Sequence, residues 1–331
     1  MLRAGQLRDA LNGEGLEDTS QSRLTRTAGF GVRWGMLAVV YVLAVSWIYA
    51  SGSSVDWPSV WPVVKPIAWL LVMTGALRIV SIKTRSLPLL HHVALVLQDV
   101  AGSAAQLLAT GALLALLIHV AASLGAGYPL RDEALARADA MLGFDWDAMS
   151  AYLDTLPGVM GALVYVYTTS LAQAGAILLL GSMRRPGSYN RELFWIVAIG
   201  SLLTVTVFLF VPVVGKLGKL DSDLIKRLTE IRAGETAMTY DRTLSLISFP
   251  SFHTFTAVII VYMSRWSRWC LVPALLINVV MLMAIPPVGG HYLVDVVAGV
   301  GVAVVSIAVV RMGFDARPRC QRSGRGPGGL A

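Results

Sequence analysis

Two short segments of the sequence contain side chains that could carry out phosphoryl transfer. The first runs from Phe249 to His253 (Phe-Pro-Ser-Phe-His) and the second from Gly290 to Asp295 (Gly-His-Tyr-Leu-Val-Asp), and each opens a long apolar run. In the second segment His291 lies four residues before Asp295, so both side chains share one face of the expected helix. A carboxylate in that place would hold one ring nitrogen of His291 and leave the other free as a nucleophile.

His253 is the expected acid–base partner of His291. Its imidazole would protonate the leaving oxygen and later accept a proton from the incoming water or alcohol. Ser251 would hydrogen-bond phosphate oxygens, and Pro250 suits a first helical position, after which free N–H groups form an anion site. This chemistry requires no metal and no cofactor. A zinc site made of His253, His291 and Asp295 is the alternative, although no further His, Cys or acidic cluster stands near these residues.

The composition of the chain indicates an integral membrane protein. Of its 331 residues, 56% are hydrophobic and only 14% are charged, with a mean hydropathy of +0.66. A soluble domain would have roughly 25% charged residues. The net charge of +7 is concentrated between the apolar runs and at the chain ends, which argues against a nucleic-acid partner. Cys270 and Cys320 are both expected near the cytoplasmic face, where neither a disulfide nor a metal site is indicated.

Long apolar runs predict an all-α fold, a polytopic membrane helix bundle of about eight transmembrane helices. Each run is close to the roughly 20 residues that a membrane-spanning helix needs, although the sixth and seventh are short. The predicted spans are 35–51, 62–82, 103–124, 158–182, 193–213, 251–265, 269–287 and 291–311.

The distribution of basic residues predicts which ends of these helices lie together. Arginines and lysines precede the first span and follow the second, fourth, sixth and eighth spans, so both termini are expected to be cytoplasmic. The opposite side then holds residues 52–61, 125–157, 214–250 and 288–290. Both histidine segments begin on that side, which predicts one shared site at the non-cytoplasmic end of the bundle.

Two of these connecting segments contain further signals. Apolar residues at helical spacing between Asp132 and Tyr152 predict one helix lying at the membrane interface. Segment 214–250 is long and carries six cations and five acids, which favours anion binding over a solvated loop with local ion pairs. The candidate phosphate-binding cations are Lys216, Lys219, Arg232 and Arg242.

The order of the motifs resembles that of the type-2 phosphatidic acid phosphatase superfamily, membrane enzymes that share a six-helix core. In that family Pro-Ser-x-His begins the fourth core helix and His-x-x-x-Asp begins the sixth. With the third predicted span as the first core helix, residues 250–253 and 291–295 fall in those places. The resemblance implies the roles derived above: His291 as nucleophile, Asp295 as its partner and His253 as acid.

Three features depart from the family pattern. Phe252 replaces the usual Gly of Pro-Ser-Gly-His, as in the inositolphosphotransferase branch. Ala284 and Ile285 stand where a Ser-Arg pair normally precedes the last His, and the outer loop contains no Lys-x6-Arg-Pro motif. Lys216 and Lys219 stand where that motif would lie.

The resemblance divides the chain into four parts. Residues 1–33 are expected to form a cytoplasmic segment, and 34–127 the N-terminal transmembrane helices including the first core helix. Residues 128–312 would form the catalytic membrane core, and 313–331 a cytoplasmic tail whose Arg- and Gly-rich composition predicts disorder.

The sequence therefore predicts a metal-independent membrane phosphatase or phosphotransferase that acts through a phosphohistidine. Its substrate would be a lipid phosphate, including a polyprenyl or inositol phospholipid, at the outer leaflet of a bacterial cytoplasmic membrane. The alternative is a non-catalytic phosphate-lipid binding protein or transporter. The missing Ser-Arg pair favours that alternative, whereas the two histidines and Asp295 argue against it, because binding alone would use Arg and Lys.

Overall fold

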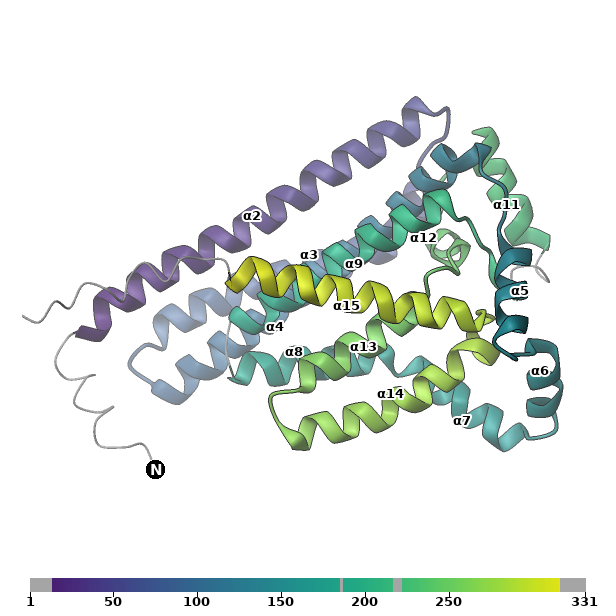
Figure 1. Cartoon of the computed structure of the whole chain (residues 1–331). Helices are drawn as coiled ribbons and strands as arrows, with labels where there is room; N and C mark the ends of the chain where they lie inside the picture. The colour runs from purple at the N-terminus through teal and green to yellow at the C-terminus, as the bar shows by residue number, and fades with distance from the viewer. Residues whose placement is uncertain (1–13, 185–186, 217–221, 316–331) are drawn as a thin grey trace, which may run out of the picture.

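The chain forms a helical bundle, seen in a computed structural model that describes residues 14–184, 187–216 and 222–315 (Figure 1). These residues contain no β-strand, and a single isolated bridge joins Val55 to Met238. The predicted all-α bundle is therefore confirmed. The helices are α2 Glu14–Ala50, α3 Trp57–Lys83, α4 Pro88–Leu124, η1 Gly125–Gly127, α5 Asp132–Met141, α6 Trp146–Asp154, α7 Pro157–Thr168, α8 Ser170–Arg184, α9 Ser188–Phe210, α11 Ser222–Ala233, α12 Tyr240–Thr243, η2 Leu244–Leu246, α13 Phe252–Ser264, α14 Arg268–Gly289 and α15 Leu293–Asp315.

The long helices establish an integral membrane protein. Within the described part of the chain, six helices are long and apolar enough to cross a bilayer: α2 from Gly29 onward, α3, α4, α9, α14 and α15. The pair α7 and α8 forms a seventh candidate span, bent by 42° at Thr169. The predicted sixth span corresponds to α13, which has 13 residues and so a length of roughly 20 Å, less than the hydrocarbon core of a bilayer.

Several predicted boundaries differ from the observed ones. The third span was expected over 103–124, but α4 begins at Pro88, a residue suited to a first helical turn, and continues through an apolar stretch. The fourth span, expected as one helix over 158–182, is interrupted at Thr169. The predicted N-terminal segment is already helical from Glu14.

The single interfacial helix predicted between Asp132 and Tyr152 is instead two helices, α5 and α6. Gly143 lies between them with a φ of 75°, a left-handed conformation that ends a helix and that favours glycine. Asp145 then starts α6, because its carboxylate accepts hydrogen bonds from the N–H groups of Asp147 and Ala148. Apolar periodicity alone does not reveal such a turn.

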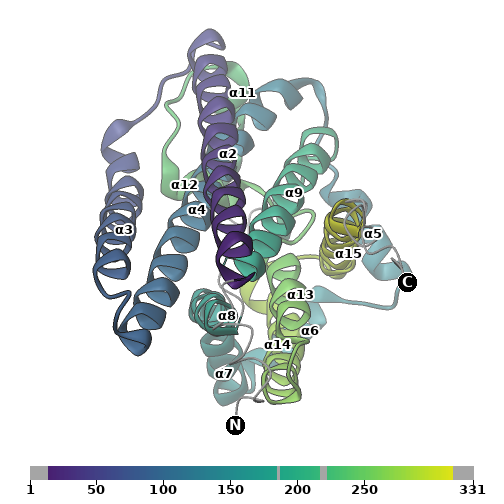
Figure 2. The same cartoon turned by 90° about the vertical axis from the view of Figure 1, so that its left-hand side faces the viewer.

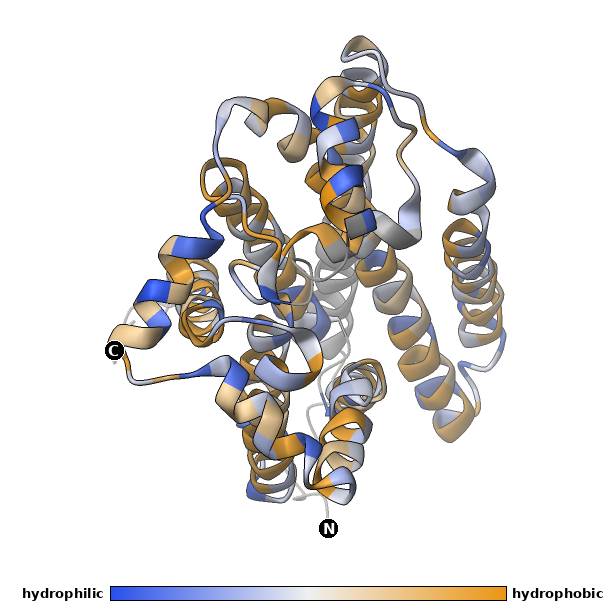
Figure 3. Ribbon diagram, turned by 90° about the vertical axis from the view of Figure 1, so that its right-hand side faces the viewer, coloured by the Kyte–Doolittle hydropathy of each residue, from blue (hydrophilic) through white to orange (hydrophobic). Residues whose placement is uncertain are grey.

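The four segments predicted for one side of the membrane lie together at one end of the bundle, on the right in Figure 1. Met238 N donates to Ser54 O at 2.7 Å, and Lys216 N donates to Gly290 O at 2.7 Å. Each of these bonds joins two of the predicted segments. Figure 3 looks onto this end and shows hydrophilic residues gathered on short helices in front of hydrophobic long ones.

Two glycines allow α13 to approach its neighbours closely. A Cβ on Gly200 of α9 would lie 2.2 Å from the Phe255 ring, and a Cβ on Gly299 of α15 would lie 2.5 Å from Ser251 O. Ser251 N also donates to Asp295 O at 3.1 Å. The first turn of α13 therefore contacts α15 through its backbone, and this contact brings the two histidine segments together.

We predict that Gly299→Ala destabilises the protein, because the added methyl group collides with the first turn of α13. Overpacking of this kind costs about 1–3 kcal/mol. Gly301→Ala is the matched control, since no heavy atom lies within 4 Å of its Cβ position. The measurement is the thermal unfolding midpoint in detergent, and equal midpoints for the two variants would show that the close approach is absent.

Candidate active site

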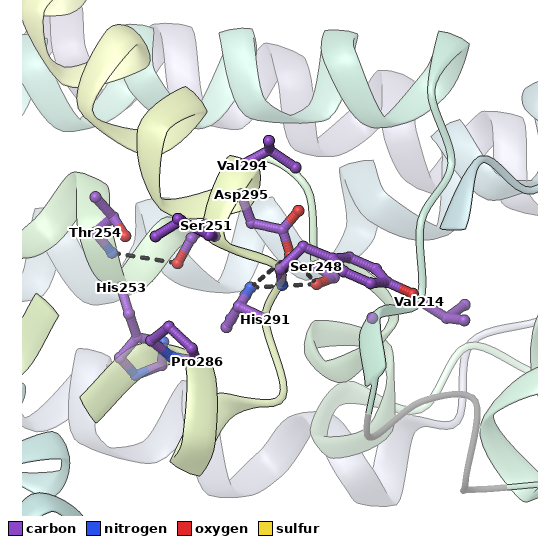
Figure 4. A network of polar contacts seen from close by, with 12 residues as sticks. Val214, Ser248, Ser251, His253, Thr254, Pro286, His291, Val294 and Asp295 are labelled. Carbon is purple, nitrogen blue, oxygen red and sulfur yellow. Dashed lines mark hydrogen bonds and ion pairs between the residues drawn. The ribbon is translucent and has the colours of Figure 1, made fainter. Parts of the chain in front are cut away.

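His291 and Asp295 are in contact at the start of α15 (Figure 4), but their expected placement on one face of a helix is wrong, because α15 begins at Leu293 and His291 precedes it. His291 Nδ1 lies 3.2 Å from Asp295 Oδ2, and both residues are buried. Ser248 Oγ donates to the same carboxylate oxygen at 2.7 Å and lies 3.2 Å from His291 Nδ1. This network is satisfied when His291 carries its proton on Nδ1, which leaves Nε2 with a lone pair for nucleophilic attack.

The carboxylate of Asp295 is fully removed from solvent, with 0% of the residue exposed. A buried charge is costly unless hydrogen bonds replace its hydration. In addition to the Ser248 hydroxyl and the His291 ring, Tyr292 N donates to Oδ2 at 2.9 Å. All three donors converge on one oxygen, and Oδ1 accepts no hydrogen bond from a described residue. The carboxylate is therefore held in one orientation against the histidine.

His253 has a different partner, the hydroxyl of Tyr167 on α7. Tyr167 Oη lies 3.1 Å from His253 Nδ1, and the two rings are stacked with centroids 4.2 Å apart and planes inclined by 21°. The contact fixes the plane of the imidazole and engages one of its nitrogens. His253 Nε2 is then the nitrogen that can exchange a proton with a substrate.

The His291 ring and the Tyr167 hydroxyl, which contacts His253, converge near Gly289, the last residue of α14. A Cβ on Gly289 would lie 3.0 Å from Tyr167 Oη and 3.3 Å from His291 Nε2. The Tyr167 hydroxyl, which contacts His253, therefore lies close to Gly289. The free nitrogen of His291 lies close to the same glycine. The two histidines are also close enough to interact electrostatically. A side chain larger than hydrogen at position 289 would press on the His291 ring and the Tyr167 hydroxyl.

Ser251 caps α13 rather than standing free. Its Oγ accepts a hydrogen bond from Thr254 N at 3.3 Å, and the residue is fully buried. This bond uses an acceptor site of the hydroxyl and leaves its proton available as a donor. The N–H groups of Phe252 and His253 belong to the first helical turn, and no described residue accepts from them. Such a helix start can bind an anion.

Acidic residues of α5 hold the backbone around His291. Asp139 accepts from Leu293 N at 2.8 Å and from Val294 N at 3.0 Å, so it caps the first turn of α15. Asp132 accepts from Gly215 N at 2.9 Å. Both aspartates are nearly inaccessible to solvent. Helix α5 therefore anchors both the start of α15 and the loop that approaches Gly290.

Lys216 is the candidate cation whose backbone adjoins the His291 segment, through its bond to Gly290 O. Its ammonium group forms an ion pair with Asp147 at 2.9 Å and lies 5.4 Å from the centre of the Trp146 ring. The Asp147 side chain is 77% exposed, so this pair is screened by solvent and holds the lysine only weakly.

The other candidate cations are placed differently. Arg232 lies on α11, which packs against α4, and its Nε and Nη2 atoms are buried with no acceptor among the described residues. Burial lowers the pKa of Arg232. Arg242 lies on α12, but its side chain is outside the described part of the structure, as is the whole of Lys219. Within the described residues, no three His, Cys, Asp or Glu side chains are grouped to hold a metal.

Three residues of this network are absent from the sequence-based prediction: Ser248, Tyr167 and Asp139. Ser248 stands two residues before Pro250 in an otherwise apolar stretch, which is a weak local signal. Tyr167 is one aromatic residue in an apolar helix, and Asp139 is one of several acids in its segment. Neither has a local pattern that distinguishes it.

We predict that Ser248→Ala lowers the stability of the protein, because it removes a donor from the buried Asp295 carboxylate. Hydrogen bonds to charged groups contribute roughly 1.5–3 kcal/mol. Ser306→Ala is the control, since that serine is equally buried on α15 but donates only to Val302 O of its own helix. Thermal unfolding in detergent compares the two variants, and a larger loss for Ser306→Ala would contradict the assigned network.

The comparison with protein families agrees with this geometry. A sequence model described as the PAP2 superfamily matches residues 133–309, more than half of the chain. The match contains both histidine segments and leaves α2, α3 and α4 outside. No curated protein and no solved structure gives a significant match. The match supports a phosphatase-type activity on phosphate esters, and the chain belongs to the PAP2 superfamily, the type-2 phosphatidic acid phosphatases that its motifs resemble.

Proposed function

We propose that this protein hydrolyses a lipid phosphate at the outer leaflet through a phosphohistidine formed on His291. One observation supports the proposal above all. The buried pair of Asp295 and Ser248 engages Nδ1 of His291, and the remaining nitrogen lies near Gly289, as does the Tyr167 hydroxyl that contacts His253. This arrangement supports His291 as the nucleophile, Asp295 as its orienting carboxylate and His253 as the acid–base group of a two-step phosphoryl transfer.

In the first step His291 Nε2 attacks the phosphorus atom, and the bond between phosphorus and the ester oxygen breaks. The leaving alkoxide takes a proton from the imidazolium form of His253. The phosphorylated ring of His291 carries a positive charge, which the carboxylate of Asp295 stabilises.

In the second step neutral His253 accepts a proton from a water molecule, whose oxygen attacks the phosphorus. The phosphorus–nitrogen bond breaks and returns its electron pair to Nε2, which releases inorganic phosphate. His253 has then regained the proton that it gave in the first step, so one turnover consumes one water and restores both histidines.

The start of α13 is the proposed binding site for the phosphoryl oxygens. The free N–H groups of Phe252 and His253 and the hydroxyl proton of Ser251 supply donors there. Lys216 is the proposed source of positive charge, because its weak pair with Asp147 can be exchanged for a phosphate oxygen. Lys219, Arg232 and Arg242 remain candidates for the same role.

The substrate is proposed to be a lipid because the site lies where apolar helices α13 and α15 begin, at the level of phospholipid head groups. The positive-inside rule puts the opposite, arginine-rich end in the cytoplasm together with both termini. The site would then face the outside of a bacterial cytoplasmic membrane. Phe252, found in place of the family's usual glycine, makes an alcohol such as inositol a second possible acceptor beside water.

Covalent trapping tests the proposal. Purified protein in detergent, given phosphatidic acid labelled with ³²P, is expected to carry acid-labile, base-stable phosphate and to release inorganic phosphate. His291→Ala should abolish the label and lower turnover by at least about 10³-fold, as loss of a nucleophile does in other enzymes. His92→Ala, an exposed histidine of α4, is the control and should match wild type.

The remaining outcomes of this experiment separate the alternatives. Label appearing in added inositol instead of free phosphate would show a transferase. The wild-type protein could instead bind phosphatidic acid without becoming labelled and without releasing inorganic phosphate. That result would contradict catalysis and would indicate a lipid-binding protein or transporter.

Tyr167→Phe tests the second histidine, because it keeps the stacked ring and removes only the hydroxyl that contacts Nδ1. The protonated form of His253 donates to that oxygen, so we predict a roughly tenfold lower kcat and an alkaline limb of the pH–rate profile moved to lower pH. Tyr165→Phe, 72% exposed on the same helix, should leave the profile unchanged. A purely structural role for Tyr167 would lower the amount of folded enzyme without moving the limb.

A further inference from the structure

A cavity of about 370 Å³ lies among α2, α3 and α4, and no residue of the His291 network lines it. Its volume is within the range of small-molecule sites. Figure 2 shows α2 and α3 on either side of α4. We call this cavity the slot, and its walls are almost entirely apolar. They include Trp34 and Val45 of α2, Val64 and Ile67 of α3, and Ala109 and Leu116 of α4.

A polar pocket adjoins one end of the slot, with Val63 and Tyr240 lining both. We call this pocket the vestibule. The segment from Ser54 to Asp56 and the segment near Met238 meet here, at the end of the bundle that also holds the histidines. Its polar wall is formed by Asp56, Ser59, Arg227 and Thr239.

The vestibule contains one positive and one negative side chain. Arg227 Nη2 donates to Ala237 O at 3.2 Å and to Thr239 Oγ1, so the guanidinium is fixed in the pocket wall. The Asp56 carboxylate makes no hydrogen bond or ion pair within the part of the chain that the structure describes. Together they complement a zwitterionic group, with an anion toward Arg227 and a cation toward Asp56.

The slot and the vestibule contribute differently to the binding of a lipid. An empty apolar cavity loses dispersion contacts, so a neighbouring hydrocarbon chain will fill the slot. Lipid tails are, however, as apolar as the side chains that line it, so filling the slot gives little preference for one lipid over another. The choice of lipid must come from the head group, and therefore from the vestibule.

We infer that the slot and vestibule bind one zwitterionic phospholipid of the ethanolamine type, with a hydrocarbon chain between α2 and α3. Its phosphate would lie against Arg227 and its ammonium group against Asp56. Most of the slot is built from α2, α3 and α4, which lie outside the stretch that matches the PAP2 superfamily, whereas its lining residues Met238 and Tyr240 lie within that stretch. The inference does not depend on the proposed phosphatase activity, because none of the residues involved belongs to the histidine site.

The slot is tested by filling it. Val64→Trp places a large ring in the cavity, whereas Val72→Trp adds the same ring at a lipid-facing position of α3 that does not line it. After purification in detergent, phospholipid retained per protein is measured by mass spectrometry. We expect loss of the retained phosphatidylethanolamine in Val64→Trp and wild-type retention in Val72→Trp. Equal retention in both variants would overturn the site.

The vestibule is tested by titrating delipidated protein with phosphatidylethanolamine or with phosphatidylglycerol that has identical acyl chains. The measurement is the shift of the thermal unfolding midpoint with lipid concentration. Wild type should prefer phosphatidylethanolamine. Arg227→Gln should weaken that binding roughly tenfold, the effect of one charge-assisted hydrogen bond, while Lys226→Gln, an exposed neighbour, should not. Asp56→Asn should remove the preference between the two lipids. A wild-type preference for phosphatidylglycerol, or equal binding of both, would contradict the zwitterion assignment.

Discussion

The candidate site is organised around one buried charge, the carboxylate of Asp295. It is completely buried, and a buried ionised group persists only if hydrogen bonds replace its water. Ser248, Tyr292 and His291 supply those donors, and the main chain of the same residue accepts from Ser251 N. The carboxylate therefore joins the start of α15 to Ser248, and the main-chain carbonyl of Asp295 joins it to the start of α13, so this one residue connects His291 to the helix that carries His253.

The short helices at this end of the bundle stabilise the arrangement from outside. Asp139 caps α15, and Asp132 holds the loop that contacts Gly290. On the neighbouring helix, Trp146 Nε1 donates to Pro286 O at 3.0 Å and so fixes the end of α14. Each of these bonds restrains a backbone segment next to His291. Because its backbone is restrained by these hydrogen bonds, the site needs little rearrangement of its polar groups when charge develops on a substrate. Such preorganisation is the condition for strong electrostatic catalysis.

Sequence alone was sufficient for the parts that local geometry determines. His291 and Asp295 are near each other in the chain and were expected in contact, although His291 precedes α15, and long apolar runs with alternating basic flanks predict the bundle and the common end of its histidine segments. Ser248 and Tyr167 could not be found this way, because they contact partners 47 and 86 residues distant and belong to no periodic pattern. The break between α5 and α6 depends on one glycine, and the 42° bend of the fourth span has no proline to signal it.

The central claim is that the free nitrogen of His291 and the imidazole of His253 share one substrate position. The most direct test is an experimental structure of the protein in nanodiscs with orthovanadate, which imitates a phosphoryl group during transfer. We predict vanadium bonded to His291 Nε2, with His253 Nε2 within hydrogen-bond distance of a vanadate oxygen. Vanadate bound elsewhere, or bound between histidine rings too distant to contact it together, would contradict the account.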